Sequence, residues 1–300
     1  MQLVTEEALL RKAGVACKRA NKTLYAITRL LPKSKRDATL LIYYYLRVID
    51  NMVDKKGLSK SARMKIIQQN RKKMDLLYKG KMPVEMDNKD MALYNFILGN
   101  PRLARRMRPQ IERLLDTMIF ESNNKKKPIS YEELINYCYL TGGSPFIMAS
   151  SMMDPGIEDS VSDKIARTFG VGSDLTHLLR DFRYDMRANE VKITREEASM
   201  FDFNNKEDLK EFARLRVHEA EAFLNMGKKY IKMTPSLTLR VTLALYRWRF
   251  LSILKKIKMR KYDLMENYSK TSFKEYMASL GIFAKELSYV FYLTFSGKKR

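Results

Sequence analysis

The apolar residues of this chain recur at intervals of three and four along most of its length, as in the segments LINYCYL and LTLRVTLALYRWRFLSIL. This spacing places apolar side chains on one face of an α-helix, whereas the strict alternation typical of strands is hard to find. Residues that break helices are few, with 12 glycines and 8 prolines among 300 residues. The sequence therefore predicts an all-α fold.

The turn-forming stretches between these helical segments are short, and the chain contains no internal repeat of fixed period. Examples of such stretches are residues 79–90 and 153–162. With 45% hydrophobic residues, the chain can bury a sizeable core. Because no stretch resembles a long flexible linker, we expect one helical domain spanning residues 1–300.

The chain is strongly basic, with 57 Lys and Arg against 34 Asp and Glu and a net charge of +23. A lysine-rich solvated surface is the commoner meaning of such a bias, and an acidic partner is the more specific one. No nucleic-acid-binding motif accompanies the charge, and the aromatic residues lie within apolar runs. We therefore expect an anionic membrane surface or a phosphate-containing substrate as partner, and no nucleic acid.

The cysteines and the chain ends predict a cytoplasmic location. Cys17 and Cys138 lack metal-ligand spacing and are interpreted as reduced thiols. The first residues lack the apolar core of a signal sequence. Near the other end, LGIFAKELSYVFYLTF is interrupted by Lys285 and Glu286 and is too short to span a bilayer. With the basic residues 298–300, this segment could lie peripherally on an anionic membrane, although a docked terminal helix is the favoured interpretation.

One polar stripe stands out within the apolar segment LLIYYYLRVIDNMVD. At about 100° per residue, Tyr43, Arg47, Asp50 and Asp54 share one helix face. The two carboxylates, four residues apart, repel each other unless a cation lies between them. An exposed ion pair of Arg47 with Asp50 would explain this stripe if it stood alone.

A second stripe lies in the segment GVGSDLTHLLRDFRYDMR. Asp174, His177, Asp181 and Asp185 share one helix face there, and the other faces are mostly apolar. A helix that concentrates three acids and a histidine on one side needs cations there. Mg²⁺ suits carboxylates because it is a hard ion that keeps several waters and bridges to phosphate oxygens. The two stripes, if they face each other, could hold several Mg²⁺ ions against a diphosphate.

Four segments together resemble the squalene and phytoene synthase family, the head-to-head trans-isoprenyl diphosphate synthases. KTLYAITRLLPKSKRDATLLIYYYLRVIDNMVD resembles the opening of these enzymes, and LLRDFRYDMR resembles their second aspartate-rich motif. YCYLTGGSP is similar to their kinked central helix, and FLSILKKIKMRKYDL to their late helix. The resemblance implies a single-domain class I isoprenoid (terpenoid) synthase fold with a central cavity. Members of this family join two prenyl diphosphates through a cyclopropyl diphosphate intermediate, using Mg²⁺.

The resemblance also implies roles for individual residues. It implies that four aspartates bind Mg²⁺, or Mn²⁺ in its place, and act in catalysis with Tyr43: Asp50, Asp54, Asp181 and Asp185. Asp174 and His177, on the second stripe, are further candidate metal ligands. The candidate diphosphate-binding residues lie near both motifs: Arg47, Arg180, Asn21, Thr23 and Lys192. Aromatic residues are candidates for an apolar lining, although ordinary core packing explains each of them singly: Tyr137, Tyr139, Phe146, Tyr246, Trp248 and Phe250.

The chain also departs from the family pattern. His177 stands where the family has an asparagine metal ligand, and Phe146 replaces a small residue of the central kink. Glu190, Lys192 and Thr194 replace a run that leads from arginine to tyrosine and proline. These departures bear on the second half of the reaction and on the choice of substrate.

Three functions therefore stay open. The first is head-to-head condensation of two farnesyl or geranylgeranyl diphosphates into a squalene- or phytoene-like hydrocarbon with release of diphosphate. The second is a related terpene synthase, cyclase or prenyltransferase that acts on one prenyl diphosphate. The third is a non-catalytic family member with a binding or assembly role. The sequence leaves open an NADPH requirement and the oligomeric state.

Overall fold

The computed structural model describes residues 5–124, 127–188 and 190–296. Throughout these ranges the chain folds into helices, and the only β-type contact there is an isolated bridge between Ile129 and Thr194. The expectation of an all-α fold is therefore confirmed. The chain divides into two compact units, one of residues 1–123 and 151–155 and the other of residues 124–150 and 156–300. Each unit is described by itself, and the expectation of one domain stays a prediction.

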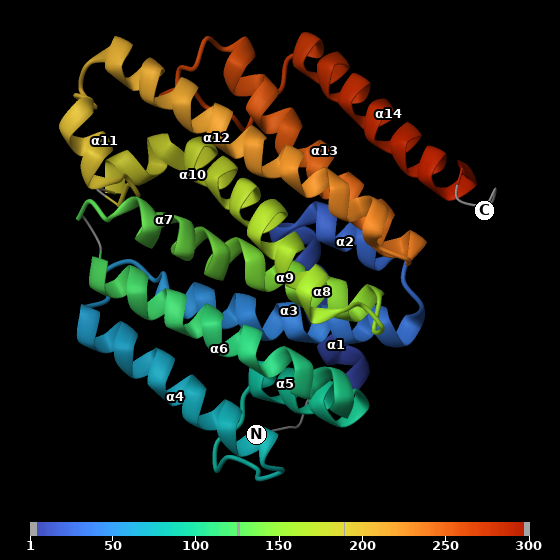
Figure 1. Cartoon of the computed structure of the whole chain (residues 1–300). Helices are drawn as coiled ribbons and strands as arrows, with labels where there is room; N and C mark the ends of the chain where they lie inside the picture. The colour runs from blue at the N-terminus through green and yellow to red at the C-terminus, as the bar shows by residue number, and fades with distance from the viewer. Residues whose placement is uncertain (1–4, 125–126, 189, 297–300) are drawn as a thin grey trace. The chain divides into compact units, whose positions relative to one another are not determined.

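The helices of the first unit follow one another with short connections (Figure 1). Their bounds are α1 (Glu6–Ala20), α2 (Lys22–Thr28), α3 (Lys33–Val53), α4 (Lys60–Tyr78), α5 (Asn88–Gly99) and α6 (Pro101–Asn124). The long helix α3 packs against α1, α4 and α5. Several of these helices begin at a side-chain cap, since Thr5, Ser59 and Asp87 each accept a hydrogen bond from the first turn of the helix they precede.

A small apolar cluster fixes α3 against α1. Ala13, Cys17 and Leu40 are buried in it, and Tyr43 and Tyr44 pack against it. Burial raises the pKa of the Cys17 thiol to about 12. The thiol therefore stays protonated and acts as a small apolar core group.

The helices of the second unit include two π-helical turns. Their bounds are α7 (Tyr131–Cys138), η1 (Tyr139–Gly143), α9 (Asp159–Ile165), η2 (Ala166–Gly170), α10 (Val171–Ala188), α11 (Arg195–Met200), α12 (Lys206–Met233), α13 (Leu237–Met259) and α14 (Phe273–Ser296). The helix α8 (Ser144–Met153) begins in this unit and ends in the other. Helix α10 packs against α12 and α13, and α14 packs along α13 (Figure 1).

The two π-helical turns cross where glycines meet. A Cβ atom on Gly142 would lie 2.3 Å from the carbonyl oxygen of Gly170, and one on Gly170 would lie 2.4 Å from the Cα of Gly143. The two backbones therefore approach closely only because these residues lack side chains. The segment that resembles the family's kinked central helix is this π-helical turn.

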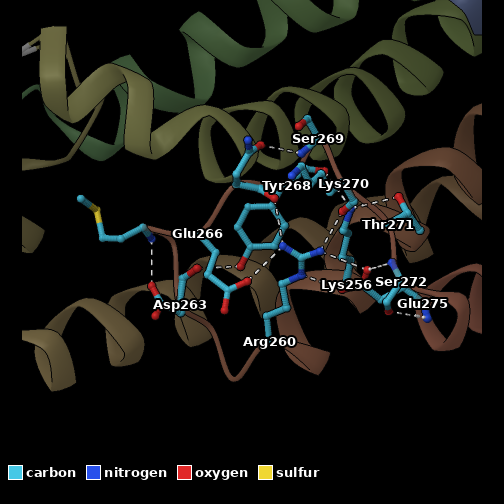
Figure 2. Close-up of polar contacts among 12 residues, drawn as sticks. Lys256, Arg260, Asp263, Glu266, Tyr268, Ser269, Lys270, Thr271, Ser272 and Glu275 are labelled. Carbon is cyan, nitrogen blue, oxygen red and sulfur yellow. Dashed lines mark hydrogen bonds and ion pairs between the residues drawn. The ribbon is translucent and has the colours of Figure 1, made fainter.

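A polar network holds the connection between α13 and α14 (Figure 2). The Arg260 guanidinium donates hydrogen bonds to Glu275 (Nε to Oε1, 2.6 Å) and to Glu266 (Nη1 to Oε2, 3.0 Å). The buried Lys256 ammonium donates to the carbonyl oxygen of Tyr268 at 2.8 Å and to the hydroxyl of Thr271 at 3.1 Å. Arg260 therefore joins the start of α14 to the end of α13, and Lys256 holds the segment that connects the two helices.

No helix in residues 5–124, 127–188 or 190–296 is long and apolar enough to cross a membrane. The basic residues 298–300, expected to contribute to contact with an anionic surface, lie outside the described residues.

Candidate functional site

The first polar stripe lies on the last turns of α3. The Arg47 Nη1 atom donates a hydrogen bond to Asp50 Oδ2 at 2.6 Å, and both side chains are partly exposed. Asp54 follows directly as the exposed C-cap of the helix. Tyr43 lies one turn before Arg47 and packs against the apolar cluster of α1 and α3. The structure therefore places Arg47, Asp50 and Asp54 on one accessible ridge whose inner end is anchored by Tyr43.

The electrostatics of this ridge favour a bound cation. Partial burial and the charges of Asp54 and Glu121 together raise the pKa of Asp50 to about 6, although Arg47 acts in the opposite direction. Arg47 alone therefore does not compensate for the crowded negative charge. Sequence reasoning missed Glu121, which comes from α6, because the surrounding residues IFESNN carry no motif.

The other two candidates of the first unit lie at the α1–α2 junction. Asn21 is the N-cap of α2, and its Oδ1 atom accepts a hydrogen bond from the Leu24 backbone N–H at 3.0 Å. Thr23 is partly buried in the first turn of α2. Asn21 therefore has a structural role in this fold, and its role toward a diphosphate stays a prediction, as does that of Thr23.

The second stripe lies along α10, and its end resembles the α3 ridge. Arg180 donates two hydrogen bonds to Asp181, from Nε to Oδ1 at 2.8 Å and from Nη2 to Oδ2 at 2.5 Å. Both side chains are about one third exposed. Asp185 follows one turn later and is partly buried. In each unit, then, an arginine is paired to the first aspartate of an i,i+4 pair.

The beginning of the α10 stripe is engaged within the fold. The Thr141 hydroxyl of η1 donates a hydrogen bond to Asp174 Oδ2 at 2.7 Å. The His177 ring lies edge-on to Phe250 of α13, with 5.1 Å between ring centroids. The His177 Nε2 atom is buried and has no hydrogen-bond partner among the described residues. Burial and the charges of Arg180 and Arg249 hold the pKa of His177 well below its usual range, so the ring is neutral.

A small pocket of about 10 Å³, room for about one water molecule, lies beside the end of α10. The residues that line it include Asp185, Lys192 and Arg216. The Lys192 Nζ atom lies 3.4 Å from the Glu190 carbonyl oxygen and 5.8 Å from the centre of the Tyr137 ring. Lys192 is thus held beside Asp185 in the same unit, and its role toward a diphosphate stays a prediction.

Arg216 was missed by sequence reasoning, although a signal was present. It stands at a core position of α12, where Phe212, Ala213, Val217 and Ala220 are buried around it. Its guanidinium is almost fully buried and is ion-paired with Glu197 and Glu219. An arginine at an apolar helix position predicts such a buried pair.

Aromatic rings gather behind the α10 stripe in the second unit. Phe146 contacts Phe169 and Tyr246, with ring centroids 5.9 Å and 5.3 Å away, and Tyr246 stacks on Phe250 at 6.2 Å. Trp248 lies elsewhere, because its ring contacts Phe283 and its Nε1 donates to Ser279. Of the expected lining residues, Phe146, Tyr246 and Phe250 therefore form one cluster with His177.

The carboxylates suit a hard divalent cation by their chemistry. No group of three or more His, Cys, Asp and Glu side chains in the described ranges is arranged to hold a metal ion by itself. Mg²⁺ is commonly held by one or two carboxylates together with waters and substrate phosphates, which fits the pairs Asp50/Asp54 and Asp181/Asp185. His177, enclosed against Phe250, fits such an ion less well. The metal assignments of all six residues, Asp174 included, stay predictions.

Comparison with known proteins relates this chain to one family. Residues 17–276 match the model of the squalene/phytoene synthase family. The 15-cis-phytoene synthase of Synechococcus elongatus is 25% identical over 199 residues, which cover 62% of this chain and 61% of that protein. The phytoene synthase of Arthrospira platensis is 25% identical over 265 residues, covering 81% of this chain and 82% of that protein.

Solved structures agree on the fold. A dehydrosqualene synthase in complex with a ligand superposes with a TM-score of 0.76 at 18% identity, covering 95% of this chain and 97% of that chain. A squalene synthase of Alicyclobacillus acidocaldarius superposes with a TM-score of 0.72 at 15% identity, covering 86% and 96%. The fold is thus the all-α class I isoprenoid synthase fold. With most of its length matched by the family model, this chain belongs to the squalene/phytoene synthase family.

Proposed function

We propose that this chain is a Mg²⁺-dependent prenyltransferase that condenses two prenyl diphosphates head to head and releases diphosphate. The observation that carries the proposal is the arrangement repeated in both units: an i,i+4 aspartate pair whose first member is ion-paired with an arginine, Arg47 with Asp50 and Arg180 with Asp181. Ordinary surface ion pairs do not explain why each arginine is accompanied by a second, repelling carboxylate. Membership of the family supports the assignment.

The four aspartates supply the oxygen ligands in this proposal. Bound Mg²⁺ would stabilise the negative charge that develops on the departing diphosphate. The pKa of Asp50 is raised by its partial burial and then by its crowding with Asp54 and Glu121, so its charged form costs free energy that a bound cation would recover. Mn²⁺ has the same ligand preference and is expected to substitute.

The arginines bind the diphosphate in this proposal. Arg47 and Arg180 are only partly buried, and each planar guanidinium can turn from its aspartate to phosphate oxygens once a metal ion neutralises that aspartate. Lys192, next to Asp185 in the small pocket, adds a third cation in the second unit. Asn21 and Thr23 are proposed as further donors to the diphosphate, and Tyr43 as the group that orients Arg47.

The aromatic cluster protects the reactive carbon chain. Loss of diphosphate from an allylic substrate leaves a carbocation, which water would capture in a wet site. Phe146, Tyr246 and Phe250 present apolar rings in the unit that carries the second stripe. Such rings exclude water and stabilise positive charge through their faces.

A second function is favoured by a specific observation. Phe146 places a bulky ring directly after the π-helical turn, packed against Phe169 and Tyr246. A ring at this place reduces the room for two long chains and suits a synthase or prenyltransferase that acts on one prenyl diphosphate. Glu190 and Thr194 also replace family residues, and Thr194 serves as the N-cap of α11.

One assay distinguishes these functions. Purified protein with Mg²⁺ is incubated with geranyl, farnesyl and geranylgeranyl diphosphate, while pyrophosphate release and extractable hydrocarbon are followed. Release together with a hydrocarbon of doubled length supports head-to-head condensation, and release with a product from one chain supports the second function. If none of the three substrates releases pyrophosphate, both enzymatic functions are excluded and the non-catalytic, binding or assembly role remains. Adding NADPH to the assay shows whether an intermediate is reduced.

A further inference from the structure

The outer face of α14 carries exposed apolar side chains near both of its ends. We define this face by its exposed residues, namely Phe273, Tyr276, Met277, Leu280, Phe291, Tyr292 and Phe295. At about 100° per residue they share one side of a helix of 24 residues, in two groups, residues 273–280 and 291–295. At about 1.5 Å per residue, this helix is about 36 Å long. The face therefore has one apolar group near each end of the helix.

The composition of this face differs from that of the remaining surface. In the described ranges, the three exposed phenylalanines of the chain, Phe273, Phe291 and Phe295, all lie on it, with 80%, 59% and 65% of their surface exposed. Exposed apolar residues elsewhere, such as Leu30 and Val84, are scattered over several helices and loops. Scattered residues are normal on a soluble protein, whereas large apolar side chains gathered on one side of a single helix mark an interaction surface.

The charges of α14 are sorted between its two sides. Both of its acids are buried on the inner side, Glu275 in an ion pair with Arg260 and Glu286 in an ion pair with Arg247. Both of its lysines, Lys274 and Lys285, are exposed. They are eleven residues apart, about three helical turns, and therefore flank the apolar face on the same side. The outside of α14 thus presents apolar groups and positive charge without an exposed carboxylate of its own.

The inner side of α14 is already occupied by α13. The Trp248 ring contacts Phe283 at 5.0 Å between centroids, and its Nε1 donates to the Ser279 carbonyl oxygen at 2.9 Å. Together with the two buried ion pairs, these contacts fix the rotation of α14 about its own axis. The outer face is therefore presented as a fixed surface, without any need for the helix to leave its place.

We propose that the outer face of α14 lies in the interfacial layer of an anionic lipid membrane. A helix with Phe, Tyr and Met on one side and lysines along the flank suits this layer, where rings enter the headgroup region and ammonium groups reach lipid phosphates. The net charge of +23 strengthens attraction to anionic lipid and opposes pairing of this face with a second copy. The helix lies on the surface, since it is not apolar enough to cross a membrane.

Flotation with lipid vesicles tests the proposal without any need for catalytic activity, so its failure is distinct from failure of the proposed function. The full-length protein is mixed with vesicles of phosphatidylcholine alone, or with about one third phosphatidylglycerol. Two variants are compared with the wild type: Phe291→Ser with Phe295→Ser, and Lys274→Gln with Lys285→Gln. Their matched controls change exposed residues elsewhere: Leu30→Ser with Val84→Ser, and Lys79→Gln with Lys81→Gln. Circular dichroism confirms that each variant is folded.

We expect the wild type to bind the anionic vesicles, and the phenylalanine variant to lose at least about tenfold in affinity. The lysine variant should bind anionic vesicles more weakly than the wild type does, with no change toward vesicles of phosphatidylcholine alone. The controls should bind like the wild type. The proposal is overturned if the wild type does not bind, or if the controls lose as much as the α14 variants. Light scattering measures the oligomeric state of the wild type and the variants. If the wild type is a dimer and the α14 variants are monomers that bind vesicles like the wild type, this face binds a second copy and the membrane proposal is refuted. Should the phenylalanine variant not fold, the lysine variant decides alone.

Discussion

At the residue scale, His177 combines two features that rarely occur together in a stable core. Its Nε2 atom is buried without a partner in the described ranges, and its ring lies edge-on to Phe250. An unsatisfied buried polar atom costs free energy, and an apolar side chain of similar size avoids this cost. His177→Leu is therefore expected to raise the free energy of unfolding by about 1 kcal/mol, measured by urea unfolding.

The other histidine of the chain provides the control. His218 is exposed, so His218→Leu should change stability by less than about 0.5 kcal/mol. If His177→Leu instead lowers stability in the absence of metal, the interpretation of an unsatisfied core histidine is wrong. If the variant folds but Mg²⁺ no longer changes its free energy of unfolding as it does for the wild type, His177 is a metal ligand.

The same residues show what the sequence could predict at this scale. The pair Arg47–Asp50 follows from i,i+3 spacing on one helix, and the structure has this ion pair. The contacts of Asp174 and His177 could not be predicted from the sequence, because their partners Thr141 and Phe250 come from other helices. Periodicity gives the face of a helix on which a residue lies, but not the residue that the fold brings opposite.

At the element scale, the crossing of η1 and η2 depends on the absence of side chains. The Cβ atom of Gly142→Ala would lie 2.3 Å from the Gly170 carbonyl oxygen, which is backbone and cannot turn aside. We expect this variant to lose about 2–3 kcal/mol in urea unfolding, because the two turns must move apart.

A glycine with open space around it is the matched control. Gly281 lies within α14, and a Cβ atom there meets nothing within 4 Å. Gly281→Ala should therefore gain about 0.5–1 kcal/mol from helix propensity alone. Equal effects of the two substitutions would show that backbone crowding does not determine the response at Gly142.

The attachment of α14 is expected to depend on pH through Glu275. The hydrogen bond from Arg260 lowers the pKa of this carboxyl to about 2, although its burial acts in the opposite direction. The unfolded chain protonates Glu275 near its ordinary pKa of about 4.3. The pair therefore contributes its full stability above about pH 5, and this contribution is lost as the pH falls from there toward 2.

Thermal unfolding between pH 5 and pH 3 measures this contribution. The wild type should lose more stability over this range than Glu275→Gln, which lacks the titrating group. Glu85→Gln, at an exposed position, should follow the wild type. Parallel pH profiles for the wild type and Glu275→Gln would contradict the assignment of the Arg260 pair as a pH-dependent anchor.

At the scale of the whole molecule, each unit carries one carboxylate pair, and the proposed reaction requires both. EDTA should abolish pyrophosphate release, and added Mg²⁺ should restore it. Asp50→Asn and Asp181→Asn should each lower the rate at least about 100-fold, since each removes charge that holds metal and diphosphate. Glu85→Gln serves as the control in this assay. A wild-type rate and Mg²⁺ requirement in either aspartate variant would refute its role.

The fold was predictable at this scale because helical periodicity is strong in long segments. The segment LTLRVTLALYRWRFLSIL lies within α13, and the segment LINYCYL lies in the helical run from α7 into η1. The division into two compact units was not predictable, because no linker separates them and α8 continues from one into the other. The π-helical form of residues 139–143 also depends on a tertiary contact, the crossing with Gly170.

The position of η2 directly before α10 has a consequence for changes in chain length. A π-helical turn accommodates about one residue more than an α-helical turn, so it shifts the rotational phase of the helix that follows by about 100°. Inserting one alanine into Ala166–Gly170 would add a residue beyond the one that this turn already absorbs, which leaves the charge and all aspartates of α10 intact yet turns Asp181 and Asp185 toward a different neighbour. The direction in which these carboxylates point is thus encoded in the spacing of a segment that contains no acidic residue.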